Sequence, residues 1–217
     1  MKKISATRIK TIKSAPKAIK RNLALALPNL LTYARILVIP IVCYMLYMNS
    51  EMYSRYVACL LFFLASITDY FDGYLSRKMK ITSEIGRFLD PIADKLLVGA
   101  VLISMAQTKF VTGFETMLAA IIISREIFIS GLREYLGGKS VKVPVSRLAK
   151  WKTAAQLFAI GFLIFGRNYR YRFYNSWWDG LLFDIYVAGV VLLLVACALT
   201  IITGWKYMRA AFKYMKE

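Results

Sequence analysis

Four aspartates lie where two strongly apolar segments of the chain meet. Asp69 and Asp72 are three residues apart and Asp90 and Asp94 are four apart, so each pair shares one face of a helix. An antiparallel pair of helices would bring the two faces together. Four carboxylates in one place repel one another, and divalent cations relieve that repulsion. All-oxygen ligands suit Mg²⁺ or Mn²⁺, so the spacing predicts a site for two such ions, suited to in-line displacement at phosphorus.

A plainer interpretation of the same residues stays open. Asp90 precedes Pro91, so it could cap a helix that begins with proline. Asp69 and Asp72 could lie close enough to a membrane interface to be hydrated. Acidic residues beside membrane spans are costly, however, and are functional by default. Four of them at helical spacing therefore favour a functional site.

Three neighbouring residues support a ligand site at the aspartates. Gly73 removes a side chain beside Asp72, which lets a ligand approach the helix backbone, and Gly86 lies one helical turn before Asp90. Helix packing is the alternative role for both glycines. Arg77 follows Asp72 by five residues, where it could meet an anionic ligand held by the metals.

The elements that must position these residues are apolar helices. The chain has 217 residues, of which 59% are hydrophobic, well above the share in a soluble domain. A helix that crosses the bilayer core needs about 20 mostly apolar residues. Six segments qualify, at roughly 30–48, 53–75, 91–110, 113–133, 151–167 and 181–204. We therefore expect an all-α integral membrane protein with six transmembrane helices.

The distribution of charge orients the predicted helices. The chain carries 30 Lys and Arg against 12 Asp and Glu, and it has no histidine. With six spans, 22 of these 30 basic residues fall on the side of the two termini, which predicts that the termini are cytoplasmic. The aromatic cluster at 169–180 would then lie at the outer interface. The three cysteines all lie in apolar runs and are expected to be buried hydrophobes.

The chain divides into a basic N-terminal cytoplasmic or juxtamembrane segment, 1–27, and a single six-helix domain, 28–217. The first 21 residues hold eight Lys or Arg and no acid. This segment is weakly amphipathic, so it could lie on an anionic lipid surface, or it could be a disordered tail.

The stretch from Asp69 to Asp94 resembles the signature of the CDP-alcohol phosphotransferase family, D-x2-D-G-x2-A-R-x8-G-x3-D-x3-D. Each fixed position matches except Ser76, where the family usually has alanine. The resemblance implies a six-helix membrane enzyme, usually a homodimer, that displaces CMP from a CDP-linked donor with an alcohol. It implies that two divalent metals are bound by Asp69, Asp72, Asp90 and Asp94. It also implies that Asp94 is the general base, and that the CDP site is lined by Asp72, Gly73, Ser76 and Arg77.

Three further motifs resemble one branch of that family, the phosphatidylglycerophosphate synthases. They are PNLLTYAR at 28–35, SREIFISGLRE at 124–134 and LAKWKTAAQ at 148–156, where the branch usually has glycine in place of Ala149. The resemblance implies transfer of the phosphatidyl group of CDP-diacylglycerol to sn-glycerol 3-phosphate, which gives phosphatidylglycerol phosphate and CMP. It also implies a multi-pass protein in the cytoplasmic membrane of a bacterium.

Four cations are candidates for binding the phosphate of the acceptor: Arg125, Arg133, Lys150 and Lys152. An unpaired cation as deep in a span as Arg125 is expensive, so a pocket that faces the aspartates would explain it. The resemblance assigns the acceptor phosphate to the first three, with Lys152 a weaker candidate. Alternatively, Arg125 pairs with an acid such as Glu126 or Glu115, and the lysines are interfacial anchors. Lys95 could neutralise the aspartates or snorkel to the interface, and the sequence assigns it no role.

Other functions remain open at this point. A sister enzyme could use the same donor with inositol, inositol phosphate, serine or phosphatidylglycerol, the last giving cardiolipin. A cation transporter would place charges near mid-membrane in several spans, whereas the aspartates here cluster at one interface. A membrane-anchored nucleic-acid binder would use the basic tail and would leave the aspartates unexplained, so we expect no nucleic-acid partner.

Overall fold

The computed structural model describes residues 30–48, 52–79, 84–138, 147–166 and 177–215, and at several helix ends, including 69–79 and 84–87, it describes the backbone alone. These residues form six helices, and the expected all-α fold is confirmed for this part of the chain. The helices are Leu30–Tyr47, α2 (Met52–Met79), α3 (Glu84–Gln107), α4 (Phe114–Gly138), α5 (Arg147–Phe165) and α6 (Trp177–Met215).

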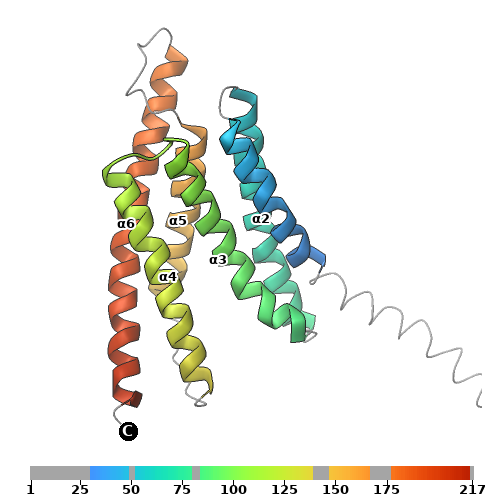
Figure 1. The fold of residues 1–217 in the computed structure, drawn as a ribbon, viewed down its shortest axis with the longest axis vertical. Coiled ribbons are helices and arrows are strands. Elements are labelled where there is room, and N and C mark those ends of the chain that lie inside the picture. The colour runs from blue at the N-terminus through green and yellow to red at the C-terminus, as the bar shows by residue number, and fades with distance from the viewer. Residues whose placement is uncertain (1–29, 49–51, 80–83, 139–146, 167–176, 216–217) are drawn as a thin grey trace, which may run out of the picture.

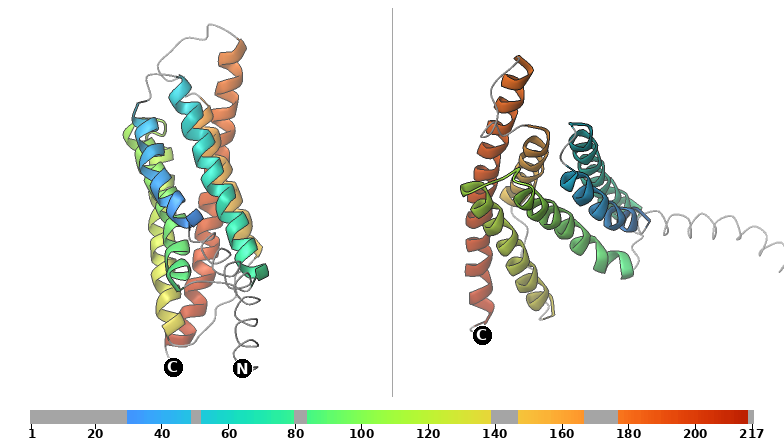
Figure 2. Two further views of the ribbon diagram at one scale, coloured as in Figure 1. Left: turned by 90° about the vertical axis from the view of Figure 1, so that its right-hand side faces the viewer. Right: turned by 45° about the horizontal axis from the view of Figure 1, so that its top comes forward.

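The helices run alternately up and down, so that successive helices are antiparallel (Figure 1). The first helix and α2 form one side of the bundle, α4 and α6 form the other, and α3 and α5 lie between them (Figure 2). The end of α2, the start of α3, the end of α4 and the start of α5 lie at the same end of the bundle as the C-terminus (Figure 1). The topology therefore brings both aspartate pairs and three of the candidate acceptor cations, Arg133, Lys150 and Lys152, toward one end, while Arg125 lies midway along α4.

A single cluster of buried apolar side chains joins all six described helices. Fully buried members from successive helices are Leu46, Phe62, Met105, Ile122, Leu163 and Leu193. Many large apolar side chains instead point outward. Leu37, Ile103, Ile127, Trp151 and Trp205 are each more than 60% exposed. An apolar exterior of this extent is expected of a surface that faces lipid.

Three helical segments in the described part of the chain are long and apolar enough to cross a membrane: Leu30–Tyr47, Leu148–Phe165 and Gly180–Phe212. A shorter apolar stretch, Tyr53–Thr68, ends immediately before Asp69. The remaining helices, α3 and α4, carry charged residues of the candidate site within their apolar runs, which lowers their hydropathy. The charged residues that suggest a function for α3 and α4 are therefore also the reason why these two helices are less apolar than the other helices.

Helix α3 begins earlier than the sequence predicts. The expected segments, 53–75 and 91–110, leave residues 76–90 between them, but α2 continues to Met79 and α3 starts at Glu84. Pro91 lies inside α3. The interpretation of Asp90 as a helix cap is therefore wrong, because the helix has already run for more than one turn before this residue. Because proline has no backbone N–H, Pro91 cannot donate the helical hydrogen bond to the carbonyl oxygen of Arg87.

The opposite end of the bundle is fixed by close contact between helices. Arg55 donates a hydrogen bond to the carbonyl oxygen of Gly166 at the end of α5, and its guanidinium lies 4.5 Å from the ring centroid of Phe110. A Cβ atom added at Gly166 would lie 2.6 Å from the backbone nitrogen of Tyr186 on α6. Glycine is therefore required where these two helices approach each other.

Candidate functional site

The four aspartates occupy the two helices that the sequence predicts for them. Asp69 and Asp72 belong to the C-terminal half of α2, and Asp90 and Asp94 lie one turn apart on α3. The side chains of Asp69, Asp72, Ser76 and Arg77 lie outside what the structure describes, and so do the surroundings of Gly73 and Gly86. The α2 half of the aspartate site and the CDP site therefore remain predictions.

A threonine from the first helix holds the carboxylate of Asp90. The Thr32 hydroxyl donates a hydrogen bond of 2.5 Å to Oδ1 of Asp90, across 58 residues of sequence. Thr32 is only 1% exposed, so water has no access to replace this contact. The bond leaves one oxygen of Asp90 with a fixed partner and orients the carboxylate as a whole.

Asp94 lines a partly open cavity of about 580 Å³ between α3, α4 and α5. The polar side chains of its lining are Asp94, Lys95, Glu126, Ser130, Lys152, Thr153 and Gln156. Apolar side chains of the same helices complete the lining, among them Ile103 and Ile127, which are also exposed at the outer surface of the bundle. A cavity that combines polar and apolar side chains suits a reaction between a water-soluble molecule and a lipid.

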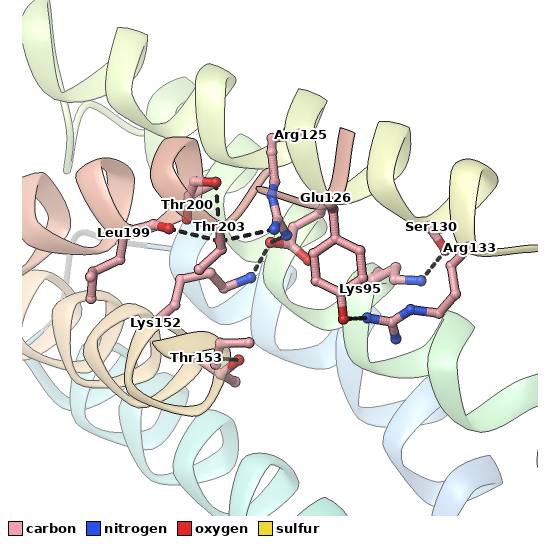
Figure 3. Close-up of polar contacts among 12 residues, drawn as sticks. Lys95, Arg125, Glu126, Ser130, Arg133, Lys152, Thr153, Leu199, Thr200 and Thr203 are labelled. Carbon is pink, nitrogen blue, oxygen red and sulfur yellow. Dashed lines mark hydrogen bonds and ion pairs between the residues drawn. The ribbon is translucent and has the colours of Figure 1, made fainter. Parts of the chain in front are cut away.

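Glu126 links α4 to α5 in this region (Figure 3). It accepts a hydrogen bond from the Lys152 ammonium on α5, and its Oε1 lies 3.2 Å from Nη1 of the neighbouring Arg125. The side chains of Lys152 and Glu126 are 7% and 20% exposed. Because the pair is largely removed from water, each charge depends on the other for compensation.

Arg125 reaches from α4 to α6. Its Nη2 donates a hydrogen bond of 2.9 Å to the Thr203 hydroxyl, which itself donates to the carbonyl oxygen of Leu199 at 2.7 Å (Figure 3). A Cβ atom added at Gly204 would lie 3.1 Å from Nε of Arg125, so α6 has a glycine where the guanidinium passes. Among the described residues, that buried Nε has no hydrogen-bond partner.

The remaining candidate cations lie apart from the cavity wall. The Arg133 guanidinium lies 5.5 Å from the ring centroid of Tyr207 on α6, and Nη2 donates to the Tyr207 hydroxyl at 3.4 Å. Lys150 is exposed at the start of α5. Of the four cations proposed for the acceptor phosphate, Lys152 is the one that the structure places on the cavity wall with Asp94. The ion pair of Arg125 with Glu126, expected as an alternative, is present.

The described residues provide half of the donor set for a metal site. No group of three or more His, Cys, Asp or Glu side chains gathers within the part of the chain that the structure describes. Asp90 and Asp94 offer carboxylate oxygens on one helix face, and Thr32 orients the first of them. Oxygen donors of this kind fit hard divalent cations. The residues present therefore fit Mg²⁺ or Mn²⁺, provided that Asp69 and Asp72 complete the set.

Several contacts of the site carry no signal in the local sequence. Ser130 accepts a hydrogen bond from Lys95, and Thr203, Gly204 and Tyr207 receive the two arginines of α4. Nothing near these positions marks them, because each contact joins residues that are more than 30 apart. A buried polar residue inside an apolar helix, such as Thr203, is the one indication that sequence alone offers.

Comparison with known proteins identifies the family. The chain matches the profile of the CDP-alcohol phosphatidyltransferase family over residues 25–206. It therefore belongs to this family, as its aspartate signature suggests.

The chain is also similar to individual bacterial proteins named CDP-diacylglycerol–glycerol-3-phosphate 3-phosphatidyltransferase. The protein from Rickettsia felis is 45% identical over 188 residues, which cover 87% of this chain and 96% of the relative. The protein from Cereibacter sphaeroides is 35% identical over 88% of this chain and 98% of its own length. The protein from Escherichia coli K12 is 35% identical over 85% of this chain and 94% of its own length.

Proposed function

We propose that this protein transfers the phosphatidyl group of CDP-diacylglycerol to sn-glycerol 3-phosphate, releasing CMP and forming phosphatidylglycerol phosphate. The observation that carries the proposal is the 45% identity, over 87% of the chain, to a relative named for this reaction. The cavity adds support, because its lining combines a carboxylate and cations with apolar side chains.

In the proposed reaction, Asp94 is the general base. Its position in the cavity wall lets it take the proton from the 1-hydroxyl of the acceptor. The oxygen of that hydroxyl then forms a bond to the phosphorus that carries diacylglycerol. The bond from this phosphorus to the oxygen of CMP breaks, and CMP leaves with the electron pair. The apolar side of the cavity suits a donor whose acyl chains stay in the membrane.

Two divalent cations would be held by Asp69, Asp72, Asp90 and Asp94. When bound, they supply positive charge that stabilises the diphosphate of the donor and the departing CMP. The contribution of this chain is orientation, since the hydroxyl of Thr32 fixes the carboxylate of Asp90. Gly73, Ser76 and Arg77, with Asp72, would line the nucleotide site on α2.

The acceptor phosphate would be bound by cations of α4 and α5. Lys152 lines the cavity, and Arg125 pairs with Glu126, which also lines it. Arg133 and Lys150 lie nearer the ends of α4 and α5, where their charge would attract an anionic acceptor.

We also propose six transmembrane spans, both termini and the active site in the cytoplasm, a bacterial inner membrane location and a homodimer. The up-and-down order of the helices supports an even number of crossings. Single cysteines at Ser140 and Ser176, in a variant without the three native cysteines, would test the orientation. A membrane-impermeant maleimide should label the variant at 176 in intact cells, and the variant at 140 only after the membrane is opened.

The activity is tested by CMP release from the purified protein in detergent. The assay contains CDP-diacylglycerol, Mg²⁺ or Mn²⁺, and one acceptor at a time: glycerol 3-phosphate, inositol, inositol phosphate, serine or phosphatidylglycerol. Release with glycerol 3-phosphate alone, abolished by Asp94→Asn, is the expected result. Release with a different acceptor would keep the aspartate chemistry and refute the proposed acceptor. No release from folded protein with any acceptor would refute the transferase activity itself.

A further inference from the structure

Lys95 is a cation of the cavity wall to which the proposed mechanism gives no role. It follows Asp94 directly on α3, and both residues line the cavity. Its ammonium donates a hydrogen bond to the hydroxyl of Ser130 on α4, one helical turn beyond Glu126 (Figure 3). The bond fixes the end of a long side chain that would otherwise be free to leave the cavity for the interface.

The two lysines of the cavity differ in how their charge is balanced. Lys152 forms an ion pair with Glu126, which also contacts Arg125, so one carboxylate already serves two cations. Lys95 instead contacts the neutral hydroxyl of Ser130. Within the described part of the chain Lys95 forms no ion pair, and the carboxylates of Glu126, Asp94 and Glu134 act on its charge only from a greater distance. The cavity thus contains a positive charge, fixed in position, that a ligand with negative charge would complement.

The position of Lys95 also matches the size of the proposed acceptor. Successive residues on a helix differ by about 100° in direction, so Asp94 and Lys95 approach the cavity from two sides. A three-carbon phosphorylated polyol has its reactive hydroxyl at one end and its phosphate at the other. With the hydroxyl at Asp94, the phosphate would lie within reach of a neighbouring ammonium group.

We infer that Lys95 binds the phosphate of the acceptor and that Ser130 holds the Lys95 ammonium in place for this contact. The inference rests on the proposed function and adds a binding residue to the same site. It makes Lys95 a determinant of specificity, because an acceptor without a phosphate, such as free glycerol, would leave this charge uncompensated in the cavity.

The test compares Lys95→Met, Lys95→Gln, Lys95→Arg and Ser130→Ala with wild type. KM is measured separately for glycerol 3-phosphate and for CDP-diacylglycerol. In a second measurement, binding of glycerol 3-phosphate alone is followed by the rise in thermal unfolding temperature in detergent as its concentration increases. Lys206→Met, which removes an exposed lysine of α6, is the matched control.

Loss of the charge in the Met and Gln variants should raise KM for glycerol 3-phosphate by about tenfold or more, as expected for a lost charge-assisted hydrogen bond. The same two variants should lose the thermal stabilisation by glycerol 3-phosphate, while KM for CDP-diacylglycerol changes by less than about twofold. Lys95→Arg should recover most of the affinity, and Ser130→Ala should cause an intermediate loss. The Lys206 variant should behave as wild type.

Two results would overturn the inference while leaving the proposed function intact. In one, the Met and Gln variants have lower kcat or stability but an unchanged KM for glycerol 3-phosphate, which would make the contact between Lys95 and Ser130 a purely structural tie. In the other, KM rises for CDP-diacylglycerol instead, which would place the charge on the donor. Wild-type protein that does not use glycerol 3-phosphate would refute the proposed function, and this inference with it.

Discussion

The hydrogen bond from Thr32 to Asp90 allows a sharp test of the predicted metal site. Substitution of Thr32 by valine removes the hydroxyl while the shape of the side chain changes little. The lost bond is 2.5 Å long, its acceptor is a carboxylate, and the donor residue is 1% exposed, so water cannot take its place. Hydrogen bonds to charged groups contribute about 1.5–3 kcal/mol.

If that free energy serves to orient Asp90 for metal binding, Thr32→Val should weaken metal affinity by about 10- to 100-fold, the usual effect of losing a residue that orients a ligand. The assay is CMP release as a function of Mg²⁺ concentration, with Mn²⁺ binding followed by electron paramagnetic resonance as a readout independent of activity. The concentration for half-maximal activity should rise, while the rate at saturating metal changes less.

Thr32→Ser is the matched control, because it keeps the hydroxyl and removes only a methyl group. It should bind Mn²⁺ with an affinity close to that of wild type. Equal metal dependence in the valine and serine variants, both folded as judged by thermal unfolding, would refute the reasoning. The contact between Thr32 and Asp90 would then join the first helix to α3 without any effect on the metal.

Two further predictions concern stability. Glu126→Gln should destabilise the protein by about 3–5 kcal/mol, because it leaves Lys152 as a buried charge without its partner. Adding Lys152→Met should restore part of this loss in a double-mutant cycle, measured by unfolding in detergent. Purely additive effects of the two substitutions on the free energy of unfolding would contradict the pairing. Gly166→Ala should destabilise by about 1–3 kcal/mol because its Cβ would overlap backbone atoms of α6, whereas Gly137→Ala, with nothing within 4 Å, should be neutral or slightly stabilising. Equal stability of the two alanine variants would contradict the close approach of α5 and α6.

The sequence predicts the order and the approximate position of the helices well, because the length and apolarity of a segment largely determine whether it forms a helix in a membrane protein. Spacing alone also places Asp90 and Asp94 on one face of α3. The start of α3 differs from the predicted segment, 91–110, because the seven residues before Pro91 already belong to the helix. The predicted sixth span, 181–204, covers only the apolar part of a helix of 39 residues.

The partners of the site residues could not be predicted in the same way. Arg125 is notable from sequence because of its depth in an apolar helix, but its contact with Thr203 joins residues 78 apart. Thr32 and Asp90 are 58 apart. Such pairs depend on how helices rotate and cross, which is set by packing over the whole bundle and leaves no trace in the local pattern. Charged residues within apolar helices therefore indicate that a site exists, but the contacts of each charged side chain depend on the packing of the helices.

The glycine at position 204 has a consequence for protein engineering. Residue 204 has no side-chain atom to bind a ligand, yet any side chain there would press on Nε and Cγ of Arg125, at 3.1 and 3.3 Å from the added carbon. The guanidinium would then have to shift relative to the Thr203 hydroxyl, by more as the added side chain grows. A designer who grafts Arg125 onto another helical scaffold must therefore transfer the vacant space on the facing helix along with it. In a library that randomises position 204, active variants should recover glycine even though this residue contacts neither substrate.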